Sequence, residues 1–116
     1  MNTLELTFNM IQALAAANCE GFTVDAKTFQ PITEGFAVAV AGTQNSFDNV
    51  GAARVAAYVC NHPEINAIGG WFNTDNKKYY FDATIVVSDL ETAIRLGREN
   101  KQIAIFNLST FEEIRL

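Results

Sequence analysis

Residues 65–89 are INAIGGWFNTDNKKYYFDATIVVSD, a segment with the pattern of two β-strands joined by a tight turn. Its first half leads through a glycine pair into Trp71, and residues 73–76 all tolerate turn geometry. Its second half, residues 79–87, is rich in β-branched and aromatic side chains, which suit a pleated, half-buried surface. The segment therefore predicts a β-hairpin around which the other elements are arranged.

The length and composition predict one globular domain spanning residues 1–116. The chain is 49% hydrophobic and 18% charged, which is enough apolar material for a packed core. It contains no apolar run long enough for a membrane span and no basic region before an apolar run at its start. We therefore expect a cytoplasmic protein that does not associate with membranes.

One helix and two short strands are predicted near the N-terminus. Apolar residues at helical spacing indicate a helix over residues 3–17, which Thr3 can cap. Residues 22–24 have the character of a strand, and residues 29–32 of a returning strand. Because Pro31 cannot donate to a sheet ladder, that second strand should lie at an edge or end there.

A buried strand and a second helix follow. Residues 36–41 form an apolar run with small alternating side chains, typical of a central strand that is buried on both faces. The next helix is predicted over residues 49–60, with Ser46 or Asp48 as its cap, and ends before Pro63.

The C-terminal part predicts a third helix and two strands. Ser88 and Glu91 have the spacing of a capping box, so the helix should begin there and continue to about Asn100. Residues 103–106 and 112–115 then have strand character, the last being short and exposed.

The combined pattern predicts an α+β domain with one mainly antiparallel sheet and about three helices. The expected order of elements is α-β-β-β-α-β-β-α-β-β. The expected core consists of apolar residues from the predicted strands and helices: Phe36, Val38, Val40, Val55, Val59, Ile85, Val87, Leu90, Ile94, Ile103 and Ile105.

Catalytic and metal-binding patterns are missing from the sequence. The single histidine, His62, stands at a predicted helix end, where a cation is favoured by the helix dipole. Cys19 and Cys60 have no metal-binding spacing and are expected to be buried or half-buried thiols. Residues 43–46 join a strand to a helix, where ligands can bind, although capping explains their polarity equally well. We expect no enzyme, no cofactor and no metal.

The aromatic residues of the hairpin allow two interpretations. Gly69-Gly70 permit a bulge or a close backbone approach, and Trp71, Tyr79 and Tyr80 follow on the two strands. These aromatic side chains either form a stacking or protein-binding surface or pair across the hairpin and cover the sheet. We favour the second interpretation, with Trp71 and Tyr79 as neighbours on the covered face, so that Trp71→Ala costs about 3–5 kcal/mol.

Three blocks of sequence carry a resemblance. They are GFTVD at 21–25 with Thr28 and GFAV at 35–38; GGW at 69–71 with YYFD at 79–82; and DLETAI at 89–94 with Gly97, Glu99-Asn100, Gln102 and AIFNL at 104–108. Together they resemble a class of small domains found in phages and integrative mobile elements, alone or inside large multi-domain proteins. The resemblance brings no catalytic residues with it. It implies a context in which small acidic proteins often inhibit host defences, including CRISPR effectors and restriction enzymes, by occupying sites that normally hold DNA or RNA.

The charge fits this context. A net charge of −5 disfavours direct binding to nucleic acid and favours a basic protein surface or a site that normally holds nucleic acid. We therefore expect a non-enzymatic inhibitor in the cytoplasm of a bacterial host, bound to a host protein or ribonucleoprotein such as a nuclease or CRISPR effector. The alternative is a structural or accessory module of a mobile element that docks to a larger protein or forms a homodimer. The expected contacts are two aromatic anchors and several acidic residues: Trp71, Tyr79, Asp75, Asp82, Glu91, Glu112 and Glu113.

Overall fold

The predicted hairpin is the centre of the structure. The computed structural model describes residues 2–116. In it, β4 (Ala67–Asn73) and β5 (Lys78–Val87) pair antiparallel, from Ala67 opposite Thr84 to Asn73 opposite Lys78. The turn between the two strands is the polar segment that the sequence indicated.

One antiparallel sheet contains all the strands of the described chain. Its order is β1-β4-β5-β2-β6-β7, and β3 pairs with β5 beside this path. The remaining strands are β1 (Gly21–Asp25), β2 (Phe36–Ala39), β3 (Ser46–Phe47), β6 (Ala104–Asn107) and β7 (Glu112–Arg115). The helices are α1 (Thr3–Ala17), α2 (Asp48–Asn61) and α3 (Leu90–Glu99), with a short 3₁₀ turn, η1 (Ala41–Thr43).

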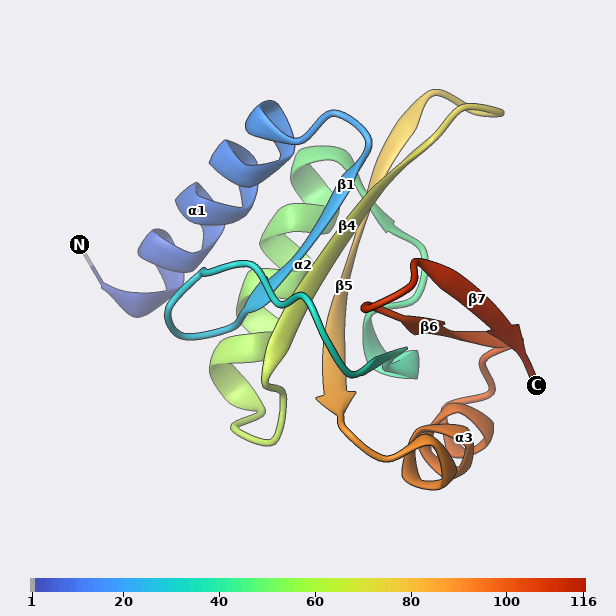
Figure 1. Cartoon of the computed structure of the whole chain (residues 1–116). Coiled ribbons are helices and arrows are strands. Elements are labelled where there is room, and N and C mark those ends of the chain that lie inside the picture. The colour runs from blue at the N-terminus through green and yellow to red at the C-terminus, as the bar shows by residue number, and fades with distance from the viewer. Residues whose placement is uncertain (1) are drawn as a thin grey trace.

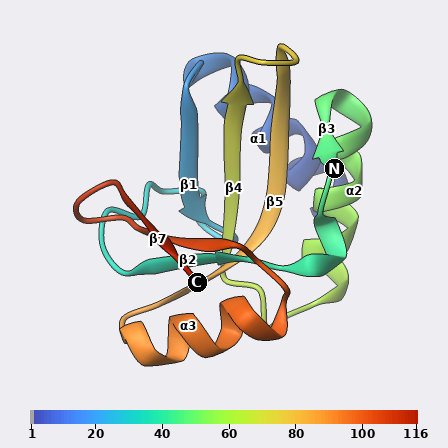
Figure 2. The same cartoon turned by 90° about the vertical axis from the view of Figure 1, so that its right-hand side faces the viewer.

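The sheet is strongly bent, and the three helices lie on its outer side. Figure 1 shows β1, β4 and β5 with α1 and α2 on one side of them, whereas β6 and β7 lie on the other side. In Figure 2 the strands β2 and β7 cross in front of the lower part of β4 and β5, with α3 below. The sheet face that carries no helix is therefore turned into the bend, and we call it the inner face.

Alternation along the strands divides the side chains between the two faces. The outer face carries Ile68 and Phe81, which form a core with Ile11 of α1 and Val55 of α2. A second core under α3 contains Val38, Ala93 and Ile105. Val40, Ile65 and Ala83 form a third cluster that also contacts α2. The inner face receives the alternate residues of β4 and β5.

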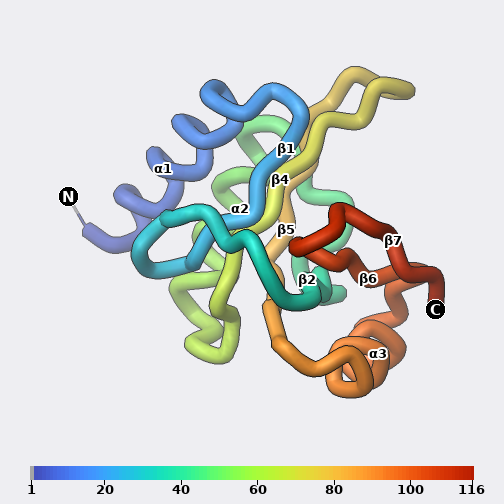
Figure 3. Tube along the Cα trace, in the orientation of Figure 1, coloured from blue at the N-terminus to red at the C-terminus, as the bar shows by residue number. Residues whose placement is uncertain are grey.

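The element order matches the prediction, but two of the strands differ from those expected. Residues 29–32 make only an isolated bridge between Val24 and Pro31. Asp25 accepts hydrogen bonds from the backbone of Lys27 and Thr28, so the chain turns there, and the Cα trace in Figure 3 shows residues 26–35 as a loop leading to β2. The missing strand is replaced in the order by β3.

All three predicted helix caps were wrong by one residue. The cap of α1 is Asn2, whose side chain accepts from Glu5 N at 2.8 Å. The cap of α2 is Phe47, without a side-chain bond, because Ser46 Oγ donates instead to Thr43 O. The cap of α3 is Asp89 rather than Ser88. Hydrogen bonds from the side chain and backbone of Thr92 hold the pKa of Asp89 below its ordinary value.

The predicted core is correct at its centre and wrong at its margins. Val38, Val40, Val55 and Ile105 are buried, whereas five other expected core residues are only half-buried: Phe36, Val59, Ile85, Val87 and Ile94. Leu90 and Ile103 are exposed, because Leu90 is the first residue of α3 and Ile103 lies in the turn before β6.

Candidate binding face on the inner side of the sheet

Four residues form one continuous row across the inner face. Gly21 of β1 lies opposite Trp71 of β4, Trp71 lies opposite Tyr80 of β5, and Tyr80 lies opposite Phe47 of β3. We call Trp71, Tyr80 and Phe47 the aromatic row. It stands near the turn of the hairpin, at the end of the sheet away from α3 (Figure 2).

The rings of the aromatic row contact one another. The centroids of Trp71 and Tyr80 are 5.0 Å apart with planes at 16°, and those of Tyr80 and Phe47 are 5.4 Å apart at 56°. Lys78 Nζ lies 4.2 Å from the centre of the Phe47 ring, a cation–π contact. Asn76 Nδ2 donates to the Tyr80 hydroxyl at 2.7 Å. The row is therefore held in place on a regular sheet by its own contacts.

The indole of Trp71 remains accessible because its other neighbour in the row has no side chain. Trp71 is 46% exposed, the largest exposed fraction among the aromatic residues of the hairpin. A Cβ at Gly21, whose φ is +153°, would lie 2.7 Å from Gly70 O. The backbone thus requires glycine at this position, and the side of the indole that faces β1 stays open.

Asp82 lies on the inner face beside the aromatic row. It is opposite Gly69, and a Cβ on that glycine would lie 2.8 Å from Asp82 Oδ1. Thr84 donates its hydroxyl to the same oxygen. Burial raises the pKa of the Asp82 carboxyl above its ordinary value, and the bond from Thr84 opposes this in part. In residues 2–116 no cation forms an ion pair with Asp82.

Tyr79 points to the outer face, so the expected pairing of Trp71 with Tyr79 was wrong. The residue opposite Tyr79 is Phe72. The ring of Tyr79 stacks on that of Phe81, with 5.2 Å between their centroids. Its hydroxyl donates to Asn18 O at 2.6 Å, which ties the hairpin to the end of α1. Burial raises the pKa of Tyr79 to about 12. Tyr79 is therefore a structural residue.

The other acidic residues named from the sequence are dispersed. Asp75 is exposed in the hairpin turn, Glu91 lies in the first turn of α3, and Glu112 and Glu113 lie on β7. Glu113 forms an ion pair with Arg115 at 3.2 Å. Of the acidic candidates, only Asp82 is brought next to an aromatic anchor.

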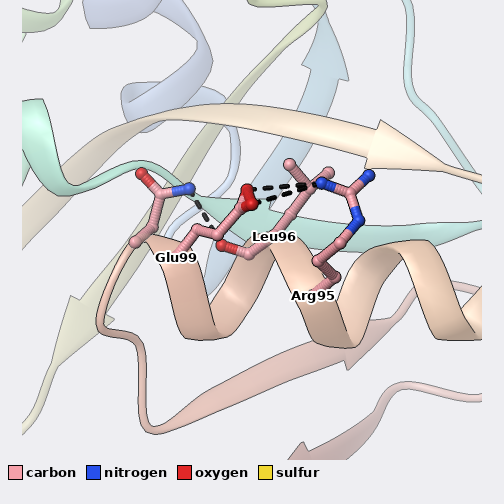
Figure 4. A network of polar contacts seen from close by, with 4 residues as sticks. Arg95, Leu96 and Glu99 are labelled. Atoms are coloured by element: carbon pink, nitrogen blue, oxygen red, sulfur yellow. Dashed lines mark hydrogen bonds and ion pairs between the residues drawn. The ribbon is translucent and has the colours of Figure 1, made fainter.

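The outer face of α3 carries its own polar contacts. Arg95 pairs with Glu99 one turn later at 3.3 Å, and Figure 4 shows this contact beside the helix backbone. A shallow depression next to it is lined by Glu91, Ile94 and Arg98 as well. Both partners of the Arg95–Glu99 pair are more than half exposed, so they contribute little energy.

Several residues whose side chains could act in catalysis or ligand binding have structural roles. His62 caps α2, stacks on Tyr58 with 3.8 Å between ring centroids, and places Nδ1 2.8 Å from Tyr58 O. In the loop before β3, Thr43 is buried, and its hydroxyl accepts from Ala83 N. Across residues 2–116, no group of three or more His, Cys, Asp or Glu side chains could hold a metal ion.

The thiols differ from expectation. Cys19 and Cys60 are both exposed and free. Cys19 lies in the connection between α1 and β1, and Cys60 lies near the end of α2, where the helix turns that residue towards solvent.

Sequence reasoning missed two members of the row and placed Trp71 on the wrong face. Phe47 belongs to a two-residue strand, which is too short to give a strand pattern in the sequence. Gly21 matters only because it lies opposite Trp71, and that pairing is known only from the structure. For Trp71, both strands of the hairpin carry aromatic residues at adjacent positions. The alternation therefore predicted two aromatic faces without showing which of them the helices cover.

Comparisons of the chain with family models, curated proteins and solved structures gave no match. A separate search of residues 2–116 for membrane-spanning helices found none with the required length and apolar character.

Proposed function

We propose that this protein is a non-enzymatic binding protein whose inner sheet face docks onto a protein partner. The observation that supports the proposal is the aromatic row: a tryptophan and a tyrosine stacked on each other, with the indole open to solvent. Tryptophan and tyrosine are the residues that most often dominate the energy of protein interfaces. They lie on a paired β-hairpin, so little conformational entropy is lost when a partner binds.

The partner class follows from the charge and the sequence resemblance. The net charge of −5 favours basic surfaces and speeds association with them. In the context of phages and mobile elements, such a surface is the nucleic-acid channel of a host nuclease or CRISPR effector. We propose that the protein inhibits a host-defence complex of this kind in the bacterial cytoplasm.

A protection assay tests the proposal. The protein is expressed in bacteria that carry a defined restriction or CRISPR system, and the efficiency of phage plating or plasmid transformation is measured. We expect the wild-type protein to restore plating against the system that it inhibits, and Trp71→Ala to abolish the effect. Phe72→Ala is the matched control, because Phe72 is the next residue, is 38% exposed and lies on the opposite face.

Two results would contradict the proposal. One is the absence of protection across a panel of restriction and CRISPR types. The other is equal protection by wild type and Trp71→Ala, which would remove the aromatic row from the interface. Thermal unfolding of both variants establishes that any loss of protection is not a loss of folding.

A further inference from the structure

The strand β7 is an edge of the sheet whose backbone is free on one side. In the sheet of residues 2–116, β6 is its neighbour and no strand lies beyond it. Leu116 N donates to Ile103 O, and the register of β6 with β7 continues from that pair, so the backbone of Ile114 also faces β6. The N–H and C=O groups of Glu113 and Arg115 therefore face outward, and no backbone group of residues 2–116 pairs with them.

An exposed aromatic residue stands at the start of this edge. Phe111 immediately precedes β7, is 79% exposed and contacts Phe106 with 6.5 Å between the ring centroids. Its φ is +60°, a left-handed conformation that is unfavourable for a bulky side chain. Phe29 has nearly the same φ, +61°, but its side chain packs against the core with α1 and α2. Burial offsets the strain at Phe29, whereas the folded chain leaves Phe111 uncovered.

The charges beside Phe111 favour a basic partner. Glu112 and Glu113 are both exposed, and among residues 2–116 only Glu113 has an ion-pair partner, Arg115. Opposite charges on facing residues stabilise a strand pair, whereas like charges destabilise it. The net charge of −5 also attracts a basic segment and speeds its association.

We propose that β7 binds an extended basic segment of the partner protein. The segment pairs with the outward backbone groups of Glu113 and Arg115 and covers the Phe111 ring with an apolar side chain. Backbone groups that recur every second residue along an edge are matched by another extended chain, whose main chain supplies affinity and whose side chains supply specificity. A nucleic-acid ligand is disfavoured because its phosphates would meet the carboxylates of Glu112 and Glu113.

This inference rests on the proposed function, since it gives the same partner a second contact. Ile105 packs under α3, so the next residue, Phe106, and the facing Glu113 lie on the inner face. A strand added to β7 therefore widens the inner face, which carries the aromatic row at its other end.

Fluorescence anisotropy of a labelled peptide tests the inference. The full-length protein is titrated with an extended peptide in which valine alternates with lysine and threonine, and with the same peptide carrying glutamate in place of lysine. Two further versions of the basic peptide are N-methylated, one at each alternate set of backbone nitrogens. We expect saturable binding of the basic peptide and no binding of the acidic one. Only one N-methylated version should lose binding, because a strand directs every second N–H towards its neighbour.

Matched variants separate a binding role of Phe111 from a structural one. Glycine adopts positive φ without penalty, so Phe111→Gly should melt at the wild-type temperature or above it. The same variant should bind the basic peptide at least about tenfold more weakly, as expected for the loss of an aromatic anchor. Lys77→Gly is the control, because Lys77 is exposed in the turn between β4 and β5 with φ +59°. It should be equally well folded and should bind the peptide no more weakly than wild type.

Four results would overturn the inference: no binding of the basic peptide, equal binding of both N-methylated versions, wild-type affinity of Phe111→Gly, or a lower melting temperature of Phe111→Gly. The protection assay distinguishes this failure from failure of the proposed function. If Trp71→Ala loses protection while Phe111→Gly keeps it, the inner face is still the docking surface and β7 does not contact the partner.

Discussion

Trp71 and Tyr80 stack face to face across β4 and β5, with their ring centroids 5.0 Å apart. Both rings stand on the face of the sheet that no helix covers, whereas Tyr79 and Phe81 of the same strand pack into the core with α1 and α2. Only one side of the hairpin is therefore packed against helices.

Trp71→Ala should have a modest effect on stability. The substitution removes an aromatic stack worth about 0.5–1.5 kcal/mol, and no closed cavity forms because the indole is 46% exposed. Phe81→Ala, at a position only 5% exposed in the outer-face core, should cost about 3–5 kcal/mol. Urea unfolding followed by circular dichroism measures both. Equal losses for the two variants would show that the indole is part of the core after all.

Tyr79→Phe should make the free energy of unfolding less dependent on pH in the alkaline range. The pKa of Tyr79 is raised to about 12 in the folded protein, against 10.0 for the ordinary group, so the folded state holds the proton more tightly. This contribution is complete below pH 10 and is lost as the pH rises towards 12. Unfolding of wild type and Tyr79→Phe is compared at pH 9 and above. A parallel decline of the two proteins would contradict the assignment.

Asp82→Asn should stabilise the protein at neutral pH. Because burial raises the pKa of this carboxyl, the folded state favours its neutral form, and stability falls as the pH rises above 3.8 through the raised value. The neutral amide avoids that loss and can still accept from Thr84. Urea midpoints should therefore be higher for Asp82→Asn than for wild type at pH 7 and should converge near pH 3. A variant that is less stable at pH 7 would refute the burial argument.

Gly51→Ala should destabilise the protein, although alanine ordinarily stabilises a helix by about 1 kcal/mol relative to glycine. Gly51 is buried in α2, and a Cβ there would lie 2.9 Å from Ser46 O and 3.1 Å from Ser46 Cα. The helix must move away from β3, at a cost of about 1–3 kcal/mol. Val50→Ala is the control, because Val50 is 82% exposed and its loss should change stability by less than about 0.5 kcal/mol. Thermal melts of both variants show whether each substitution raises or lowers the stability.

The edge strand β7 should keep the protein monomeric through its charges. Glu112 and Glu113 are exposed on a strand that has a neighbour on one side only. Charged side chains on such an edge oppose pairing with a second copy. Light scattering after size exclusion should show a wild-type monomer, whereas replacing both glutamates with threonine should give concentration-dependent dimers. A wild-type dimer would favour the self-associating module over the inhibitor.

The sequence predicted most helices and strands correctly because each is marked by a local pattern of residues. Alternation and turn residues identify β4 and β5, and the order of the elements follows from reading the chain in sequence. The two errors in the strands have different causes. Residues 29–32 have strand composition, yet Pro31 and the turn at Asp25 leave only one bridge, whereas β3 is too short to have a pattern of its own.

The candidate site was only half predictable. Trp71 and Asp82 were both named from the sequence, but their position on the same face depends on register and on which face of the sheet the helices cover. Register is a tertiary property: a shift of one residue in the pairing would exchange Trp71 with Phe72 and Asp82 with Phe81 between the faces. No single-strand pattern contains that information.

The adjacent glycines Gly69 and Gly70 give this protein two independent points of adjustment. A methyl group on Gly69 would press on the Asp82 carboxylate, while one on Gly70 would lie 2.8 Å from Phe22 Cζ and 2.9 Å from Tyr79 Cε1. A substitution at Gly69 would therefore act on the inner face, and a substitution at Gly70 would act on the packed outer face. Two neighbouring positions in the chain can thus change the two faces of the sheet separately.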